Sequence, residues 1–309
     1  MSEWQFIDWI RTRTDAAHKG GPKVDPVILG PGDDAGIVTL KPETIAAVDM
    51  LMDGVHFELG KIDPALAGRK ALAVNLSDIA AMGARPVCAL VSLALPAKGG
   101  LSAGQKMMEG IMKLAGEFDV SILGGDTNSW AGPAVISVTV LGEPLPGRPA
   151  LKRSGARAGD WILVTGNLGG SLGSQRHLTF TPRVREAAFL NSHFELTSMI
   201  DLSDGLATDA SHIARESRIA IRLDPANIPV SPDTQNGSAA QRLAHAMTDG
   251  EDFELMFTAA PEVAREILGK QPLAGVRVTH IGECVAGNPQ VTWRDGTVIE
   301  ARGFEHRLD

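Results

Sequence analysis

Residues 71–84 read ALAVNLSDIAAMGA, a run of small and apolar residues that one carboxylate, Asp78, interrupts. The pattern predicts a helix over residues 70–82 that ends at Gly83, with Pro86 beyond it. A carboxylate inside such a helix is costly unless it is paired or bound to a metal ion, and helix capping does not explain it there. Asp78 is therefore the first candidate functional residue.

Strand-like and helix-like segments lie on both sides of this helix. Strands are expected at residues 44–50, 88–95, 120–123, 135–141, 161–165, 219–223, 254–258 and 276–282, and helices at 3–12, 103–117, 184–191, 206–215, 239–247 and 261–268. Their mixture in both halves predicts an α+β or mixed α/β fold. Residues 143–160 are rich in Pro, Gly, Lys and Arg and form the best linker candidate, so two domains are expected at 1–147 and 148–309.

Composition excludes several classes of protein. A length of 309 residues favours two domains, and 44% hydrophobic residues suffice for packed cores. With 29 Lys+Arg against 37 Asp+Glu and no basic cluster, a nucleic-acid partner is not expected. Cys88 and Cys284 are widely separated, which argues against a disulfide framework and suits a reducing cytosol. The sequence shows no signal peptide and no apolar run of about 18–20 residues, so we expect a cytoplasmic protein without a membrane partner.

Aspartates in small-residue settings recur along the chain. They are Asp33, Asp34, Asp49, Asp78, Asp126, Asp201 and Asp204. Most follow or interrupt apolar segments, and we expect them at strand ends in both halves. Adjacent glycines let a phosphate approach the backbone, and carboxylate oxygens with substrate phosphates are the ligands of Mg²⁺. The competing interpretation is that each is a helix cap or turn residue, and for Asp204, which precedes Gly205, a turn explains the residue nearly as well.

Other catalytic templates fit poorly. The chain has no GxxxxGK[ST] motif, and the glycines after residues 161–165 lack GxGxxG spacing. Residues 169–173 match GxSxG around Ser171, but a nucleophile elbow needs its serine at the strand end, and here 166–170 intervene. The eight histidines form no HExxH motif. His56, between two apolar residues, is by itself typical of a packed histidine.

Taken together, a series of motifs resembles the bacterial thiamine-monophosphate kinases, within the wider superfamily of aminoimidazole ribonucleotide synthetase. The matching segments are Gly32-Asp33-Asp34-Ala35, Asp49 with Gly54-Val55-His56-Phe57, residues 71–84, Gly124-Gly125-Asp126-Thr127, Arg153-Ser154-Gly155-Ala156, Thr181-Pro182-Arg183, residues 200–206 and residues 250–255. They span nearly the whole chain, and residues 75–84 together with 201–206 are the most specific part of the resemblance.

The resemblance implies a two-domain aminoimidazole ribonucleotide synthetase-like fold. The N-terminal domain would bind ATP and Mg²⁺ and would dimerise, with its strands forming a barrel across a homodimer, and the C-terminal domain would be α/β. The implied reaction is ATP-dependent phosphorylation of thiamine phosphate to thiamine diphosphate, assisted by several Mg²⁺ ions. Direct in-line transfer needs positioning and charge neutralisation, and the acceptor phosphate is itself the nucleophile.

The resemblance also assigns roles to residues. Metal ligands would be Asp34, Asp49, Asp78, Asp126, Asp201 and Asp204, with Asp33 beside them; ATP contacts would be Gly125, Asp126, Arg153 and Ser203; and thiamine phosphate contacts would be His56, Glu251, Asp252 and Phe304. Asp126 and Arg153 would be catalytic, with Arg153 stabilising charge on the transferring group.

The chain departs from the family pattern at Ala47-Val48, where hydroxyl-bearing residues are usual, and at Met50, where Thr is common. These departures put one or two metal sites in doubt. One alternative is therefore a non-catalytic Mg-ATP-binding paralogue. The other is a different ATP-dependent enzyme of the superfamily, although a selenophosphate synthetase would need a reactive N-terminal cysteine and the hydrogenase-maturation relative a C-terminal one.

Overall fold

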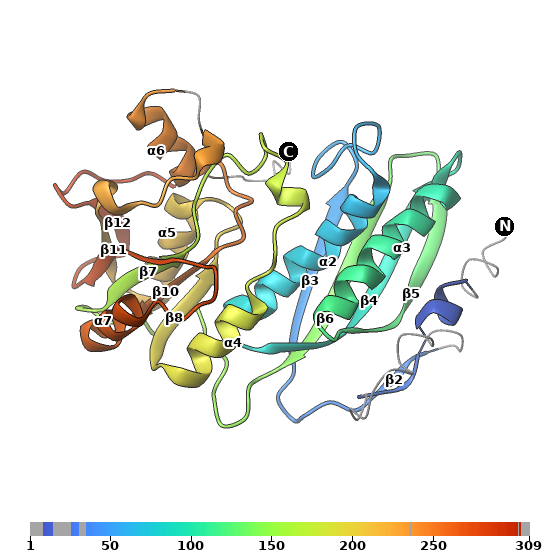
Figure 1. Ribbon diagram of the computed structural model, residues 1–309, viewed down its shortest axis with the longest axis horizontal. Helices are drawn as coiled ribbons and strands as arrows, with labels where there is room; N and C mark the ends of the chain where they lie inside the picture. Colours follow the sequence, from blue (N-terminus) through green and yellow to red (C-terminus); the bar gives the residue numbers. More distant parts are fainter. Residues whose placement is uncertain (1–8, 15–25, 31–34, 235–236, 302, 304–309) are drawn as a thin grey trace. The chain divides into compact units, whose positions relative to one another are not determined.

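A computed structural model describes residues 9–14, 26–30, 35–234, 237–301 and 303 (Figure 1). Residues 9–14 are helical, and the rest of the helix predicted at 3–12 lies outside the described residues. Internal contacts divide the chain into two compact units. The first unit is Met1–Ile79 with Arg85–Pro144, and the second is Ala80–Ala84 with Leu145–Asp309.

The first unit is built on a four-stranded sheet in the order β3-β6-β4-β5. Its strands are β3 (Ile45–Met52), β4 (Arg85–Pro96), β5 (Ser121–Trp130) and β6 (Val135–Glu143), and its helices are α2 (Pro64–Ala81) and α3 (Gly100–Glu117). β6 is antiparallel to β3 and β4, whereas β5 runs parallel to β4. Both helices lie on the same side of the sheet (Figure 1). A separate pair, β1 (Val27–Leu29) and β2 (Ile37–Val38), is antiparallel.

Glycines allow α2 and α3 to pack backbone against backbone. A Cβ added at Gly68 would lie 1.9 Å from the carbonyl oxygen of Met107, and one added at Gly110 would lie 1.9 Å from that of Ala65. No side chain fits at either position without separating the helices, so this pair of glycines sets how closely the helical layer can pack.

The second unit contains a six-stranded sheet in the order β12-β9-β11-β7-β10-β8. Its strands are β7 (Trp161–Thr165), β8 (Leu196–Asp201), β9 (Ala220–Leu223), β10 (Leu255–Ala259), β11 (Val278–Val285) and β12 (Gln290–Trp293), and its helices are α4 (Val184–His193), α5 (Leu206–Ser217), α6 (Ala239–Thr248) and α7 (Pro261–Lys270). All neighbouring strands are antiparallel except β12 and β9. Ile162, Ile200, Ile213 and Met256 belong to the core where α5 packs on the sheet.

The α+β class is confirmed, but several local expectations were wrong. β1, β2, β8 and β12 were not expected, and β5 continues through Gly124-Gly125 to Trp130 because its pairing with β4 runs as far as Pro96. The aspartates are consequently not all at strand ends. Asp49 and Asp126 lie within β3 and β5, and Asp78 lies within α2. Neither large sheet closes on itself in the described residues.

Among the described residues, no helix has both the length and the apolar character needed to cross a membrane.

Candidate functional site

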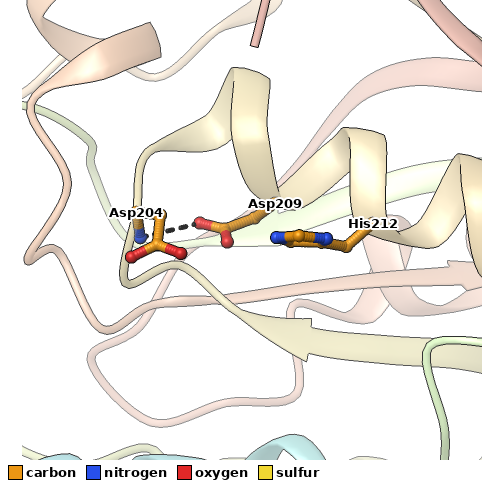
Figure 2. A group of neighbouring side chains, drawn as sticks. All are labelled: Asp204, Asp209 and His212. Atoms are coloured by element: carbon orange, nitrogen blue, oxygen red, sulfur yellow. Dashed lines mark hydrogen bonds between the residues drawn. The ribbon is translucent and has the colours of Figure 1, made fainter. Parts of the chain in front are cut away.

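In the second unit, an acidic cluster forms where β8 passes into α5. Asp201 is the last residue of β8, and Asp204 lies in the turn before the helix. Gly205 forms the N-cap with φ of 104°, a conformation that favours glycine. Ligand atoms of Asp204, Asp209 and His212 all lie within 4.8 Å of one another (Figure 2). Two carboxylates and an imidazole at this spacing form a donor set that could hold a divalent cation.

The electrostatics of this cluster fit a cation. Burial raises the pKa of Asp209 well above its ordinary value, and the charges of Asp201 and Asp204 add to that rise. Burial also raises the pKa of Asp204. The pKa of His212 is lowered by burial and then by the positive charge of Arg153, which favours the neutral imidazole that a metal requires. Carboxylates that oppose each other's ionisation would be stabilised by a bound cation.

Two members of the cluster, Asp209 and His212, were missed by sequence reasoning. They lie three residues apart in the expected amphipathic helix, so they share one helical face. That spacing was the available signal. Asp209 is only 2% exposed, which the sequence pattern did not reveal because acidic residues early in a helix are commonly solvated.

The acidic turn, residues 201–205, is hydrogen-bonded directly to the segment that carries Glu251 and Asp252. The backbone N–H of Glu251 donates to the Ser203 carbonyl at 2.7 Å, and that of Phe253 donates to the Leu202 carbonyl at 2.8 Å. Glu251 and Phe253 both have left-handed backbone, with φ of 57° and 51°. Such conformations in non-glycine residues are strained and cluster at ligand sites. The structure thus brings together predicted metal and predicted acceptor residues of the second unit.

Asp252 holds the loop that follows β7. Its carboxylate, 2% exposed, accepts hydrogen bonds from the Gly169 N–H at 3.0 and 2.8 Å and from the Arg176 guanidinium at 3.0 Å. Burial raises the pKa of Asp252 to about 7, against the lowering effect of these donors. Glu251 lies beside His177, with 3.4 Å between its Oε2 and the ring Nδ1. Asp252 therefore stabilises the loop after β7 through these hydrogen bonds, in addition to any contact with a substrate.

Ser171 lies within the same loop and is fully buried. The loop separates it from the end of β7, and Gly169 and Gly170 both have left-handed backbone, with φ of 90° and 75°. A buried serine away from the strand end cannot act as an exposed nucleophile. The GxSxG match is therefore a feature of loop packing.

The first unit holds the other predicted site residues. The half-buried Asp49 on β3 is in register with the buried Val138, whereas the exposed Asp126 on β5 is in register with the exposed Ser92. Strand register thus does not group Asp49 with Asp126. Asp126 accepts a hydrogen bond from the Asn128 side-chain amide at 2.8 Å.

Two more predicted residues of the first unit are Asp78 and Gly125. Asp78 is half-buried on α2. At Gly125 a Cβ would lie 1.8 Å from the Val91 carbonyl oxygen, so strand packing alone requires glycine at this position.

The remaining predicted residues include His56 of the first unit, whose Nδ1 accepts a hydrogen bond from the backbone N–H of Met52 at 3.0 Å. Arg153 is exposed in the second unit, and its charge acts on Asp204. The Ser203 side chain forms a hydrogen bond with Asp204. Asp33, Asp34 and Phe304 lie outside the described residues. Gly303, next to Phe304 in sequence, packs so tightly on the acidic turn that a Cβ would lie 2.0 Å from the Asp204 carbonyl oxygen.

Comparison with known proteins identifies relatives. Residues 32–143 match the family model of AIR synthase related protein, N-terminal domain. A thiamine-monophosphate kinase of Rhodopirellula baltica is 39% identical over 295 residues, which cover 92% of this chain and 89% of the relative.

Solved structures agree with the sequence relatives. The crystal structure of a thiamine-monophosphate kinase from Stenotrophomonas maltophilia superposes with a TM-score of 0.81 at 32% identity, over 97% of this chain and 98% of the other. A structure described as AaThiL complexed with AMPPCP and TMP gives 0.74 at 27% identity, over 99% and 97%. The chain belongs to the thiamine-monophosphate kinase family.

Proposed function

We propose that this chain transfers the γ-phosphoryl group of ATP to thiamine phosphate and so produces ADP and thiamine diphosphate. The observation that carries the proposal is 39% identity to a thiamine-monophosphate kinase across 92% of the chain. Likeness to a structure described as holding both AMPPCP and TMP supports the same pair of substrates. A phosphate acceptor is already a nucleophile at neutral pH, so the protein's task is positioning and charge neutralisation.

Magnesium would be held by carboxylates of both units. Asp201 and Asp204 are the ligands proposed for the second unit, with Asp209 and His212 beside them, and Asp49, Asp78 and Asp126 are those proposed for the first, with Asp33 and Asp34 of the Gly32-Asp33-Asp34 motif. The charge of Asp204 helps to raise the pKa of the buried Asp209, and this opposition to ionisation supports a cation in the cluster. When bound, the ions would neutralise phosphate charge and orient the transferring group.

The chain's own residues would bind and orient the substrates. Arg153 is exposed near the acidic turn and would stabilise negative charge on the transferring phosphoryl group. Ser203 and Gly125 would contact ATP along with Asp126. His56, Glu251, Asp252 and Phe304 would contact thiamine phosphate. The bonds that join Glu251 and Phe253 to the acidic turn support a shared site for metal and acceptor groups in the second unit.

We also propose that the chain forms a homodimer through the sheet of the first unit, with strands of two copies forming a barrel. Val48 on β3 and Leu90 on β4 are both in register with Thr139 of β6, so their side chains share one face. Val48, Leu90 and Met50 are 64%, 36% and 58% exposed. An apolar sheet face of this kind, with β3 at the sheet edge, supports burial against a second copy.

We propose residues 1–147 as the domain that binds ATP and Mg²⁺ and dimerises, and residues 148–309 as the C-terminal α/β domain. A cytoplasmic location is proposed because Cys88 and Cys284 are buried and form no disulfide, which fits a reducing compartment.

The function is tested by incubating the purified full chain with ATP, Mg²⁺ and thiamine phosphate and by following thiamine diphosphate. Product in a single turnover supports the kinase, and its loss in the Asp204→Asn variant ties the activity to the acidic cluster. Tight ATP binding without any product would instead identify the non-catalytic paralogue. Product formed from another phosphorylated acceptor alone would indicate a different enzyme of the superfamily.

A further inference from the structure

Glu254 is a buried carboxylate beside the acidic turn, with 4% of its surface exposed. Its Oε2 accepts hydrogen bonds from the Thr165 hydroxyl at 2.6 Å and from Nε of Arg183 at 2.8 Å, and its Oε1 accepts from Nη2 of the same guanidinium. Gly166 lies so close that a Cβ there would be 2.1 Å from Oε1. The carboxylate thus joins the end of β7 to the N-cap of α4.

The Arg183–Glu254 pair is ionic and largely withdrawn from water, with side chains 19% and 5% exposed. Burial alone would lower the pKa of Arg183, but the hydrogen bond and charge of Glu254, together with the charge of Glu186, outweigh it and raise that pKa. A buried ion pair is often no more stabilising than apolar side chains of similar volume. The pair therefore calls for a reason other than stability, and the best attested one is to select a single register of the chain.

The backbone of Glu254 is paired with the acidic turn. Its carbonyl accepts a hydrogen bond from the Leu202 N–H at 2.8 Å. In the sheet, Leu255 of β10 lies opposite Asp201 of β8, so this bond continues the antiparallel register of the two strands into the turn. Leu202 directly follows Asp201 and precedes Asp204 by two residues. A shift of the Glu254 backbone would therefore displace both carboxylates.

The segment that leads into Glu254 is strained. Glu251 and Phe253 have left-handed backbone, with φ of 57° and 51°. Such conformations persist only where the surrounding structure over-determines them. Glu254 directly follows Phe253, and its carboxylate ties the chain to two other elements at that point. The ion pair with Arg183 is thus placed to prevent the segment from relaxing to ordinary backbone.

We propose that Glu254 and Arg183 are positioning residues for the acidic turn: their buried ion pair holds residues 251–254 in the strained conformation that sets Asp201 and Asp204 in place for a divalent cation. This rests on the cation site of the proposed function. Neither residue of the pair touches the cation. They act through the backbone bonds between Glu254 and Leu202.

The test replaces the pair by two apolar side chains. Glu254→Met alone should lower the melting temperature sharply, because it leaves the buried Arg183 guanidinium without its closest partner. The double variant Glu254→Met/Arg183→Met should recover most of that loss. Its apparent Mg²⁺ affinity, from melting curves over a Mg²⁺ titration, should nevertheless be about tenfold or more below that of the wild type. A double variant with wild-type Mg²⁺ affinity would overturn the proposal, since the pair would then serve stability alone.

A second variant and a control accompany this comparison. Should the double methionine variant not fold, Glu254→Gln/Arg183→Met keeps an acceptor for the Thr165 hydroxyl, and the same loss of Mg²⁺ affinity is expected. Arg222 and Glu283 form a half-exposed ion pair at 3.1 Å between β9 and β11 of the same unit. Arg222→Met/Glu283→Met is the matched control and should leave the Mg²⁺ affinity unchanged.

A double-mutant cycle asks whether the pair acts through the acidic turn. If it does, Glu254→Met/Arg183→Met should add little to the loss of Mg²⁺ affinity that Asp204→Asn causes. Fully additive losses would place the effect of the pair at another site and would contradict the proposal.

These titrations contain neither ATP nor thiamine phosphate, so they keep the inference distinct from the proposed function. If the wild type binds Mg²⁺ but makes no thiamine diphosphate, and the double variant binds Mg²⁺ more weakly, the proposed function fails and the positioning stands. If Mg²⁺ does not stabilise the wild type, the positioning fails even where the kinase is active.

Discussion

The backbone N–H of Asp204 donates a hydrogen bond to the Oδ2 of Asp209 at 3.2 Å (Figure 2). The acidic turn is thus tied to a carboxylate of the helix that follows it. Asp209 thus orients Asp204 and also offers a carboxylate to the same candidate cation site. Asp209 should therefore affect both the conformation of the turn and its affinity for a cation.

Asp209→Asn should uncouple these two effects. The amide oxygen can still accept from Asp204, but the carboxylate whose ionisation burial opposes is lost, so the free protein should melt at the same or a higher temperature. Mg²⁺ should stabilise the variant less than the wild type, with about a tenfold weaker apparent affinity as the expected scale. Melting curves over a Mg²⁺ titration measure both quantities. Asp295→Asn, at a fully exposed position, is the control, and equal Mg²⁺ responses in all three proteins would exclude Asp209 from the site.

Removal of divalent metal should abolish activity. The chain carries a net charge of −8 and gathers carboxylates around its acidic turn, so without cations it would repel ATP. The measurement is thiamine diphosphate formation in excess EDTA and after restoration with Mg²⁺. Unchanged activity in EDTA would rule out metal-bridged phosphate binding.

Asp78→Asn and Asp126→Asn should abolish turnover while the fold survives. Asp78 lies in the interior of α2 and Asp126 within β5, so neither is a helix cap. Asparagine replaces aspartate well as a cap or turn residue but poorly as a metal ligand. Turnover and circular dichroism of the two variants check this. Near-wild-type rates in both would assign them a structural role only.

The stability of the protein should fall as the pH rises from about 4 to about 7, in part through Asp252. The pKa of Asp252 is about 7 in the folded chain, above its ordinary value of 3.8, so the folded state holds this proton more tightly than the unfolded state. The resulting contribution is present below the ordinary value and is lost as the pH rises through 7. It is at most about 4 kcal/mol.

Urea unfolding between pH 4 and pH 8 measures this dependence. Asp252→Asn should flatten that part of the curve, since asparagine retains an acceptor for the Gly169 N–H but cannot ionise. Asp295→Asn again serves as the control. The same pH slope in the Asp252 variant and the wild type would show that Asp252 is ionised throughout the range.

Residues in strongly patterned segments were predictable from the sequence. The apolar spacing over residues 70–82 indicated α2, and the apolar run at 161–165 indicated β7. β8 was missed because its sequence, LTSMID, has neither a continuous apolar run nor a clean alternation. The true extent of β5 depends on its pairing with β4. A local sequence pattern cannot predict pairing between distant segments.

The residues of the candidate site also fall into two groups: those that a local motif predicts and those whose burial or partners depend on the completed fold. Asp201 and Asp204 were recognisable because their motif is local. The burial of Asp209 follows from packing in the completed fold. The partners of Asp252, Gly169 and Arg176, lie 83 and 76 residues away in sequence, so their hydrogen bonds could not be inferred from spacing.

The two left-handed residues that flank Asp252 would respond differently to directed evolution for heat resistance. A left-handed non-glycine residue costs on the order of 1 kcal/mol, so glycine is locally easier at either position. At Phe253 that gain is outweighed, because its buried ring stacks on Phe180 with 4.2 Å between the ring centroids. At Glu251 the side chain is only partly buried. A library selected for heat resistance alone would accumulate glycine at 251 and keep phenylalanine at 253, whereas a library selected for catalysis would keep the Glu251 carboxylate, which we propose contacts thiamine phosphate.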